Sequence, residues 1–151
     1  MPHALNLTLP LKQDPASKQK LAYIAANFSK EIQPAIDKAL AASKIVHFAR
    51  VLVIDDKYLQ VITEYDGSHK EYTEFFRKAL SPVFEALFSL AEGAPPWDQL
   101  DQNSFFEFSK KCNIKSLGTA TDGSVGVDGQ PAGYLFSAYG TKTVKEILPK
   151  L

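Results

Sequence analysis

The sequence predicts a ferredoxin-like α+β fold, βαββαβ, with a four-stranded antiparallel sheet and long helices on one of its faces. Segments that alternate like strands and segments with the three- and four-residue spacing of helices follow one another in the order strand, helix, strand, strand, helix, strand. The chain has 151 residues, of which 45% are hydrophobic, so it can build one core. We therefore expect residues 1–151 to form a single ferredoxin-like domain.

The first strand is expected at residues 4–11, where every second residue is a leucine. A helix should begin at Asp14 and Pro15, which are typical of a helix N-cap and first turn, and its apolar residues recur every three or four positions. Pro34 should kink or restart this helix before it ends near Ser43.

Two further strands, expected at 45–54 and 58–65, should be joined by a tight turn. The length of that turn decides which side chains share a sheet face, because a shift of one residue exchanges the faces. A two-residue turn places His47 on the face of Glu64, whereas a three-residue turn places Arg50 there. In a regular hairpin only one of these two side chains can share that face.

The strand at 45–54 is apolar on both sides, so both faces of the sheet should be covered. An uncovered face with several large apolar side chains would exceed the patch usual on a soluble monomer. We expect a homodimer that packs sheet on sheet and buries roughly 800 Å² per partner. The alternative is that the insertion at 94–132, with Trp97 and three phenylalanines, folds across this face as a lid.

Residues 66–68 should close the hairpin and cap a second long helix, which Pro82 should bend or divide. The insertion at 94–132 consists of a short helix at 102–112 and a glycine-rich loop. The last strand is expected at 134–139, with a helical turn or two near the C-terminus.

The charge balance argues against two classes of partner. Seventeen basic residues match seventeen acidic ones, and no run of Lys or Arg is longer than a pair, so we expect no nucleic acid and no membrane as partner. The N-terminal residues lack a signal-peptide pattern and Cys112 is the one cysteine, which predicts a cytoplasmic protein. Without a recognisable histidine partner, Cys112 is expected to be a half-buried structural thiol.

Five polar residues of the predicted sheet are candidates for binding a small apolar ligand in a mixed cavity on the sheet face: Asn6, His47, Arg50, Gln60 and Glu64. A lone strand histidine is more often structural, and Arg50 with Glu64 forms either an ion pair at a pocket or a structural bridge. The histidines fit no metal-ligand spacing, and the Asp-Gly pairs at 122–123 and 128–129 indicate turns, so no metal site is expected.

Two segments, HFARVLVIDDKYLQVITEYDG and SAYGTKTVKEI, resemble a bacterial family of dimeric α+β barrel proteins. Its members have HFAR, a strand ending in two aspartates, a strand closing on Tyr/Phe-Asp-Gly, and later a Tyr-Pro-Gly-like turn and a Thr-Val. The matching residues are His47, Phe48, Ala49, Arg50, Asp55, Asp56, Tyr65, Asp66, Gly67, Tyr139, Gly140, Thr143 and Val144. The resemblance covers the strand pairs and part of the second helix, and it implies a dimer without implying a reaction.

The wider superfamily that this fold resembles includes dye-decolourising haem peroxidases, chlorite dismutase-like proteins and cofactor-free monooxygenases. The peroxidases carry a Gly-x-x-Asp-Gly motif on the distal side of the haem. Here Asp122-Gly123 is preceded by Gly118, one position too early, and the length suits one ferredoxin-like unit rather than two. We therefore expect no haem and no other cofactor.

Three functions are consistent with the sequence. The first is a homodimeric protein that binds a small molecule or acts as an accessory protein. The second is an oxidative enzyme of the dimeric α+β barrel class, haem-dependent or cofactor-free, in which His47 or Arg50 polarises the substrate. The third is a structural or protein-interaction module. Fold analogy supports all three and does not choose between them.

Overall fold

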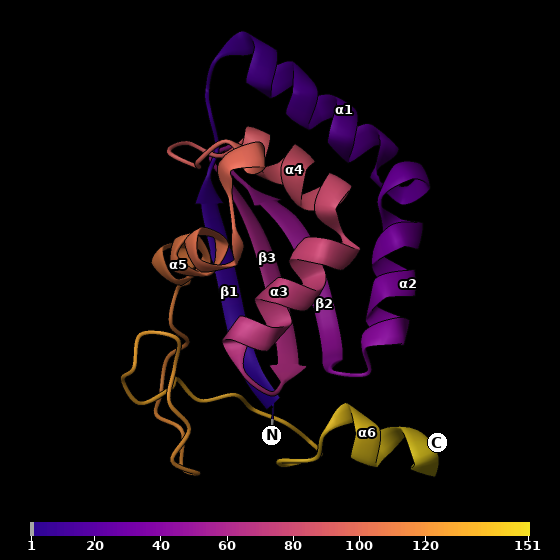
Figure 1. Ribbon diagram of the computed structural model, residues 1–151, viewed down its shortest axis with the longest axis vertical. Coiled ribbons are helices and arrows are strands. Elements are labelled where there is room, and N and C mark those ends of the chain that lie inside the picture. Colours follow the sequence, from indigo (N-terminus) through magenta and orange to yellow (C-terminus); the bar gives the residue numbers. More distant parts are fainter. Residues whose placement is uncertain (1) are drawn as a thin grey trace.

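The computed structural model describes residues 2–151. Figure 1 shows the strands and α-helices, which are, in chain order, β1 (Pro2–Pro10), α1 (Pro15–Glu31), α2 (Gln33–Ser43), β2 (Val46–Ile54), β3 (Tyr58–Asp66), α3 (His69–Ala79), α4 (Ser81–Ser89), α5 (Gln102–Cys112) and α6 (Val144–Ile147). Short 3-10 helices lie at Trp97–Gln99 and Leu148–Lys150. Within the described residues, no helix combines the length and apolarity needed to cross a bilayer.

The sheet has three antiparallel strands in the order β1-β3-β2, so the prediction of a four-stranded ferredoxin-like sheet is wrong. The predicted last strand, 134–139, is irregular. A fourth strand would need a free edge, and next to β1 that edge is occupied. The N–H of Ile114 donates to the Asn6 carbonyl at 2.9 Å, and the Asn6 N–H donates to Asn113 Oδ1 at 2.9 Å. The Tyr134 N–H instead donates to the carbonyl of Leu117.

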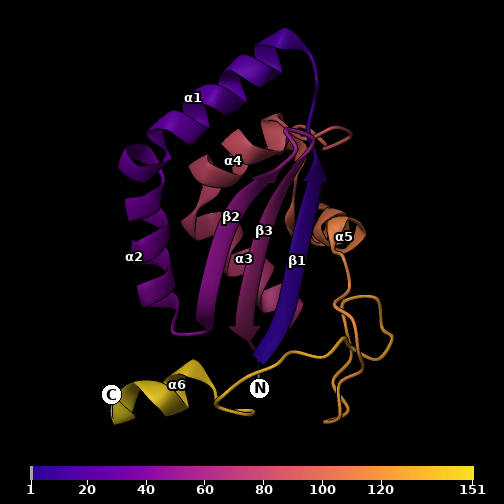
Figure 2. The same ribbon diagram turned by 180° about the vertical axis from the view of Figure 1, so that it is seen from behind.

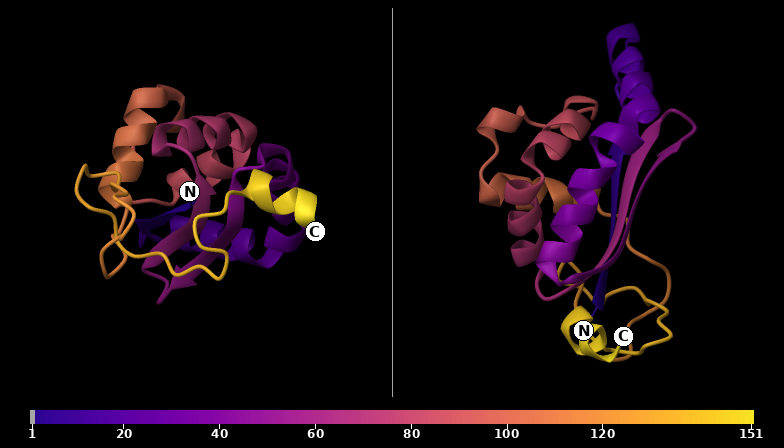
Figure 3. Two further views of the ribbon diagram at one scale, coloured as in Figure 1. Left: turned by 90° about the horizontal axis from the view of Figure 1, so that it is seen from below. Right: turned by 90° about the vertical axis from the view of Figure 1, so that its right-hand side faces the viewer.

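One face of the sheet packs on helices and carries the core. The leucines of β1 pair across from the buried side chains of β3, with Leu5 opposite Thr63, Leu7 opposite Val61 and Leu9 opposite Leu59. Helices α3, α4 and α5 lie on this side (Figures 1 and 3). Figure 2 shows that no helix crosses the other side, which we call the open face.

The aromatic residues of the insertion belong to the helix side. The Trp97 ring lies 5.6 Å from that of Phe88 in α4, and the Phe105 ring lies 5.6 Å from that of Phe84. Phe108 also packs on Phe88, with ring centroids 5.2 Å apart. These residues fill the space between α4 and α5, so they do not form a lid over the open face.

Proline divides both helical regions, as predicted. Pro34 lies in the first turn of α2 and Pro82 in the first turn of α4, where the missing N–H has no acceptor to lose. The side chain of Asp14 caps α1 by accepting the N–H of Ser17 at 3.0 Å. No residue of α1 is fully buried, and α2 buries only Ala39. These two helices therefore lie at the periphery, on the β2 side of the sheet (Figure 1).

The turn between β2 and β3 contains three residues, because Ile54 pairs with Tyr58. Asp55 and Asp56 adopt left-handed backbone angles, with φ of 53° and 55°, which short polar residues tolerate. Phe48 therefore lies opposite Glu64, and Arg50 shares the open face with that carboxylate. A bulge interrupts the pairing between Val46 and Phe48, so the hairpin is not regular at His47.

Candidate functional site

A cavity of about 680 Å³ lies at the end of the sheet where β1 begins and β3 ends. Its walls are this end of the sheet, the start of α3, the second half of α5 and the irregular segment from residue 113 to residue 141. Figure 1 shows that segment running past the end of β1 after it leaves α5. We call this space the basal cavity. Its volume is in the range of sites that bind small molecules, about 300–1,000 Å³.

Aromatic rings form the wall contributed by the sheet and the helices. The ring of His3 lies 5.8 Å from that of Tyr65, and the ring of His69 lies 5.2 Å from that of Phe106. Tyr65 stacks on Tyr72 at 4.3 Å, which anchors it in the core behind the cavity. The wall is therefore flat, aromatic and held from behind.

A chain of hydrogen bonds fixes this wall. The Ser109 hydroxyl donates to the Phe106 carbonyl at 2.7 Å, so it accepts the proton of His69 Nε2 at 2.9 Å. His69 Nδ1 then accepts from the Tyr65 hydroxyl at 3.1 Å. This assignment follows from satisfying every donor once, and it makes His69 the Nε2–H tautomer. The chain ties together β3, α3 and α5.

Burial keeps these groups neutral. Desolvation lowers the pKa of His69 to about 4, and the positive charge of Lys110 acts in the same direction. Burial also raises the pKa of the Tyr65 hydroxyl well above its usual range. Ser109 is 1% exposed, and its proton is already donated to a carbonyl. The Ser109–His69–Tyr65 arrangement resembles a catalytic proton relay in its connectivity. Its neutral, fully hydrogen-bonded groups make it a structural support rather than an activated nucleophile.

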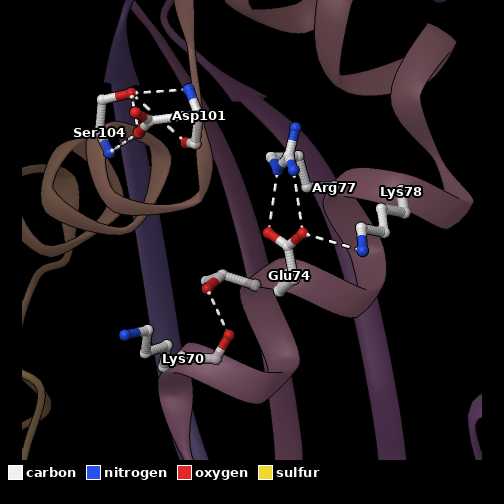
Figure 4. A network of polar contacts seen from close by, with 7 residues as sticks. Lys70, Glu74, Arg77, Lys78, Asp101 and Ser104 are labelled. Atoms are coloured by element: carbon white, nitrogen blue, oxygen red, sulfur yellow. Dashed lines mark hydrogen bonds and ion pairs between the residues drawn. The ribbon is translucent and has the colours of Figure 1, made fainter.

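Two lysines bring positive charge to the helical walls of the cavity. The Nζ of Lys110 lies 5.4 Å from the centre of the Phe106 ring, and its nearest carboxylate, that of Glu107, is 3.8 Å away. Lys70 also lines the cavity. Figure 4 shows its side chain pointing away from the neighbouring Glu74 carboxylate.

Glu74 is already occupied by other cations of α3. Arg77 donates to both of its oxygens, at 3.0 and 2.9 Å, and Lys78 lies 3.4 Å away (Figure 4). These bonds, together with the charges of Arg77 and Lys78, lower the pKa of Glu74. The Lys70 side chain thus takes no part in this network.

The facing loop wall carries two aspartates, which form local turns. Asp122 Oδ1 accepts the Ser124 N–H at 2.9 Å, and Asp128 Oδ1 accepts the Gln130 N–H at 3.0 Å. The hydrogen bonds from Ser124 lower the pKa of Asp122. These contacts agree with the prediction that both Asp-Gly pairs are turns. Among residues 2–151, no group of three or more His, Cys, Asp or Glu side chains is placed to hold a metal ion.

None of the five residues predicted to bind a ligand lines the basal cavity. Asn6 donates through Nδ2 to the Ile114 carbonyl at 2.8 Å and to Ser116 Oγ at 3.0 Å. Gln60 donates to Thr8 Oγ1 at 3.1 Å. Both side chains therefore stabilise the open face and the β1 edge.

The bulge brings His47 as well as Arg50 near Glu64, which a regular hairpin would not allow. Burial raises the pKa of Glu64, and the charges of Arg50 and His47 oppose that shift. His47 Nε2 also lies 2.9 Å from Asp66 Oδ1, while Asp66 Oδ2 accepts the Val144 N–H at 2.8 Å. These contacts connect the end of the sheet with α6, which is some eighty residues further along the chain.

A second, much smaller cavity of about 40 Å³ lies between the sheet and helices α2, α3 and α4. Its lining is almost entirely apolar, and Thr63 lies in it. Burial raises the pKa of the neighbouring Tyr72 to about 12, and a hydrogen bond with the Thr63 side chain opposes that shift. This cavity has room for about one water molecule.

Sequence reasoning missed Lys70, Lys110, His69 and Ser109 as residues of a site. The available signal was the spacing of Tyr65 and His69. These residues are four positions apart on either side of the turn that reverses the chain between β3 and α3, so their side chains can meet. Comparisons with protein-family models, with curated proteins and with solved structures find no match to this chain.

Proposed function

We propose that this protein binds a small organic molecule in the basal cavity and acts by binding rather than by catalysis. The observation that carries the proposal is the cavity itself, about 680 Å³ with a preformed aromatic wall. Hydrogen bonds from three elements hold that wall, so little side-chain freedom is lost when a ligand binds.

Binding is favoured over catalysis because the two hydrogen-bonded titratable groups of the wall, His69 and Tyr65, have pKa values far from neutral pH. His69 is neutral and both of its ring nitrogens are hydrogen-bonded, and Tyr65 has a raised pKa. A general acid or base works best with a pKa near the working pH. The oxidative alternative placed His47 or Arg50 at the substrate, and these two lie outside this cavity.

A cavity-filling variant tests the proposal. Ligands are first identified by saturation-transfer NMR with a fragment library, and their affinities are then measured by calorimetry. Ala120 lines the cavity, so Ala120→Trp should abolish binding, whereas Ala138→Trp, at an exposed position outside the lining, should retain it. Binding that survives in Ala120→Trp, or a library from which nothing binds, contradicts the proposal.

We also propose that two copies associate through the open face. Its apolar side chains include Phe48, 69% exposed, and Tyr58, 43% exposed. Arg50 and Glu64 share this face and carry opposite charges, so a two-fold axis can pair Arg50 of one copy with Glu64 of the other. This complementarity favours a second copy over an unrelated partner.

The association is tested by sedimentation velocity. The wild type should sediment as a dimer, and Phe48→Glu should be monomeric because it places a like charge beside Glu64 in the apolar surface. Phe136→Glu is the matched control, since Phe136 is 85% exposed in the segment after α5. A monomeric wild type, or a dimer that Phe48→Glu leaves intact, would show that this face is not the interface.

A further inference from the structure

We infer that the ligand of the basal cavity is a planar molecule with an anionic group, which Lys110 and Lys70 recognise. The inference rests on the proposed binding function and narrows it to a class of ligand. It is carried by two lysines that line the cavity, of which Lys110 lies over the Phe106 ring and has only the loose, solvent-exposed contact with Glu107 at 3.8 Å.

Lys110 is placed to act on an anion at the aromatic wall. Its Nζ lies over the Phe106 ring, 5.4 Å from the centroid, and the side chain is 32% exposed. Its charge reaches the inner end of the wall, because it contributes to the lowered pKa of His69. Glu107 is a weak competitor at 3.8 Å, since its own side chain is 68% exposed and therefore well hydrated.

Lys70 strengthens this arrangement from α3. The Arg77 and Lys78 side chains bind Glu74, and Figure 4 shows the Lys70 side chain pointing away from that carboxylate. Two lysines from different helices therefore line one cavity. Charge-assisted hydrogen bonds of this type are about twice as strong as neutral ones.

The other charges of the lining decide the orientation of the ligand. Lys115, Asp122 and Asp128 belong to the loop wall, and each aspartate uses one oxygen to close its own turn. Two carboxylates against one ammonium leave the loop side with a net negative charge, whereas the charged groups of the helical walls are both lysines, so an anion is directed to the helical wall. The planar part then lies against Phe106 and His69, whose rings are 5.2 Å apart.

A series of three indoles separates charge from shape. Indole-3-acetate, indole-3-acetamide and tryptamine share one ring and carry a negative, a neutral and a positive side chain. By calorimetry at pH 7, the acetate should bind at least about tenfold more tightly than the acetamide, and tryptamine should bind most weakly. Lys110→Met should reduce the preference for the acetate to about twofold, while Lys110→Arg should retain it.

Two matched controls accompany the series. Lys111 is the next residue of α5, is exposed and does not line the cavity, so Lys111→Met should leave the preference unchanged. Phe106→Leu should weaken binding of the acetate by about fivefold, because a flat surface is lost. Phe75→Leu, at an exposed position outside the lining, should not weaken it.

The outcomes distinguish the failure of the anionic ligand class from the failure of the binding function. Equal affinities for the acetate and the acetamide, or tightest binding of tryptamine, overturn the anionic ligand and leave the binding function standing. If none of the indoles binds, the fragments found by NMR decide. Anionic planar fragments support the inference, whereas neutral or cationic ones overturn it. An empty screen overturns the binding function itself.

Discussion

Acid should destabilise this protein through one buried histidine. The pKa of His69 falls from 6.5 to about 4 because the folded protein buries the ring, whereas in the unfolded chain it returns to about 6.5. Between these values the unfolded chain binds a proton that the folded protein does not, so the free energy of unfolding decreases as the pH falls. At about 1.4 kcal/mol per pKa unit, the loss between pH 7 and pH 4 is about 3 kcal/mol.

The variant His69→Gln isolates this contribution. A glutamine does not titrate, and its amide can accept from the Tyr65 hydroxyl or donate to Ser109. Urea unfolding is measured for both proteins at pH 7, 6, 5 and 4. The stability of the wild type relative to the variant should fall by about 3 kcal/mol over this range, while titrations common to both proteins cancel in the difference. His47→Gln is the control, because it retains His69 and so should retain this loss.

Two results would refute the reasoning. Parallel stability curves for the wild type and His69→Gln would mean that the fold does not disfavour the charged imidazole. The same conclusion would follow if the Cε1 proton resonance of His69, followed by NMR, titrated near pH 6.5. A resonance that stays constant from pH 7 to pH 5 agrees with a neutral, buried ring.

Three further predictions concern the backbone, the core and the C-terminus. Thr63→Val removes the buried hydroxyl that hydrogen-bonds with Tyr72 at nearly constant shape, so it should lower the free energy of unfolding by about 1 kcal/mol in urea titrations; unchanged or raised stability would contradict this bond. Gly133→Ala places a methyl group against the carbonyl oxygen of Ser116, so it should displace the loop wall and abolish ligand binding; unchanged affinity would show that the loop wall does not shape the site. Asp66→Ala removes the acceptor of the Val144 N–H, and amide hydrogen exchange should accelerate in α6 but not in α5.

Local pattern predicted most of the elements because it reflects local energies. The alternating leucines of β1, the prolines that begin α2 and α4, and the capped helix α5 all depend on neighbours within a few residues. The hairpin was also predicted, including the consequence of a three-residue turn for Arg50. The bulge at His47 was not, because it depends on how β2 meets β3 rather than on the composition of β2.

The fourth strand shows where local pattern is insufficient. Residues 134–139 are rich in aromatic and aliphatic residues, as strands often are, yet a strand forms only where another strand offers unpaired backbone groups. At the edge of β1, Ile114 takes those groups as soon as the chain leaves α5. The side chains that would have entered the sheet, such as Phe136, remain exposed.

The sequence by itself determined the α+β class, the boundaries of the first three strands and of the main helices within a few residues, and the separation of one apolar sheet face from one mixed face. Only the tertiary structure decided that the sheet has three strands and that the cavity lies at its end rather than on its face. The physical reason is distance along the chain. The basal cavity brings together residues of four elements, namely His3, Tyr65, His69, Phe106 and Lys110. Such contacts depend on how the elements pack against one another, and the periodicity of a single element carries no information about that packing.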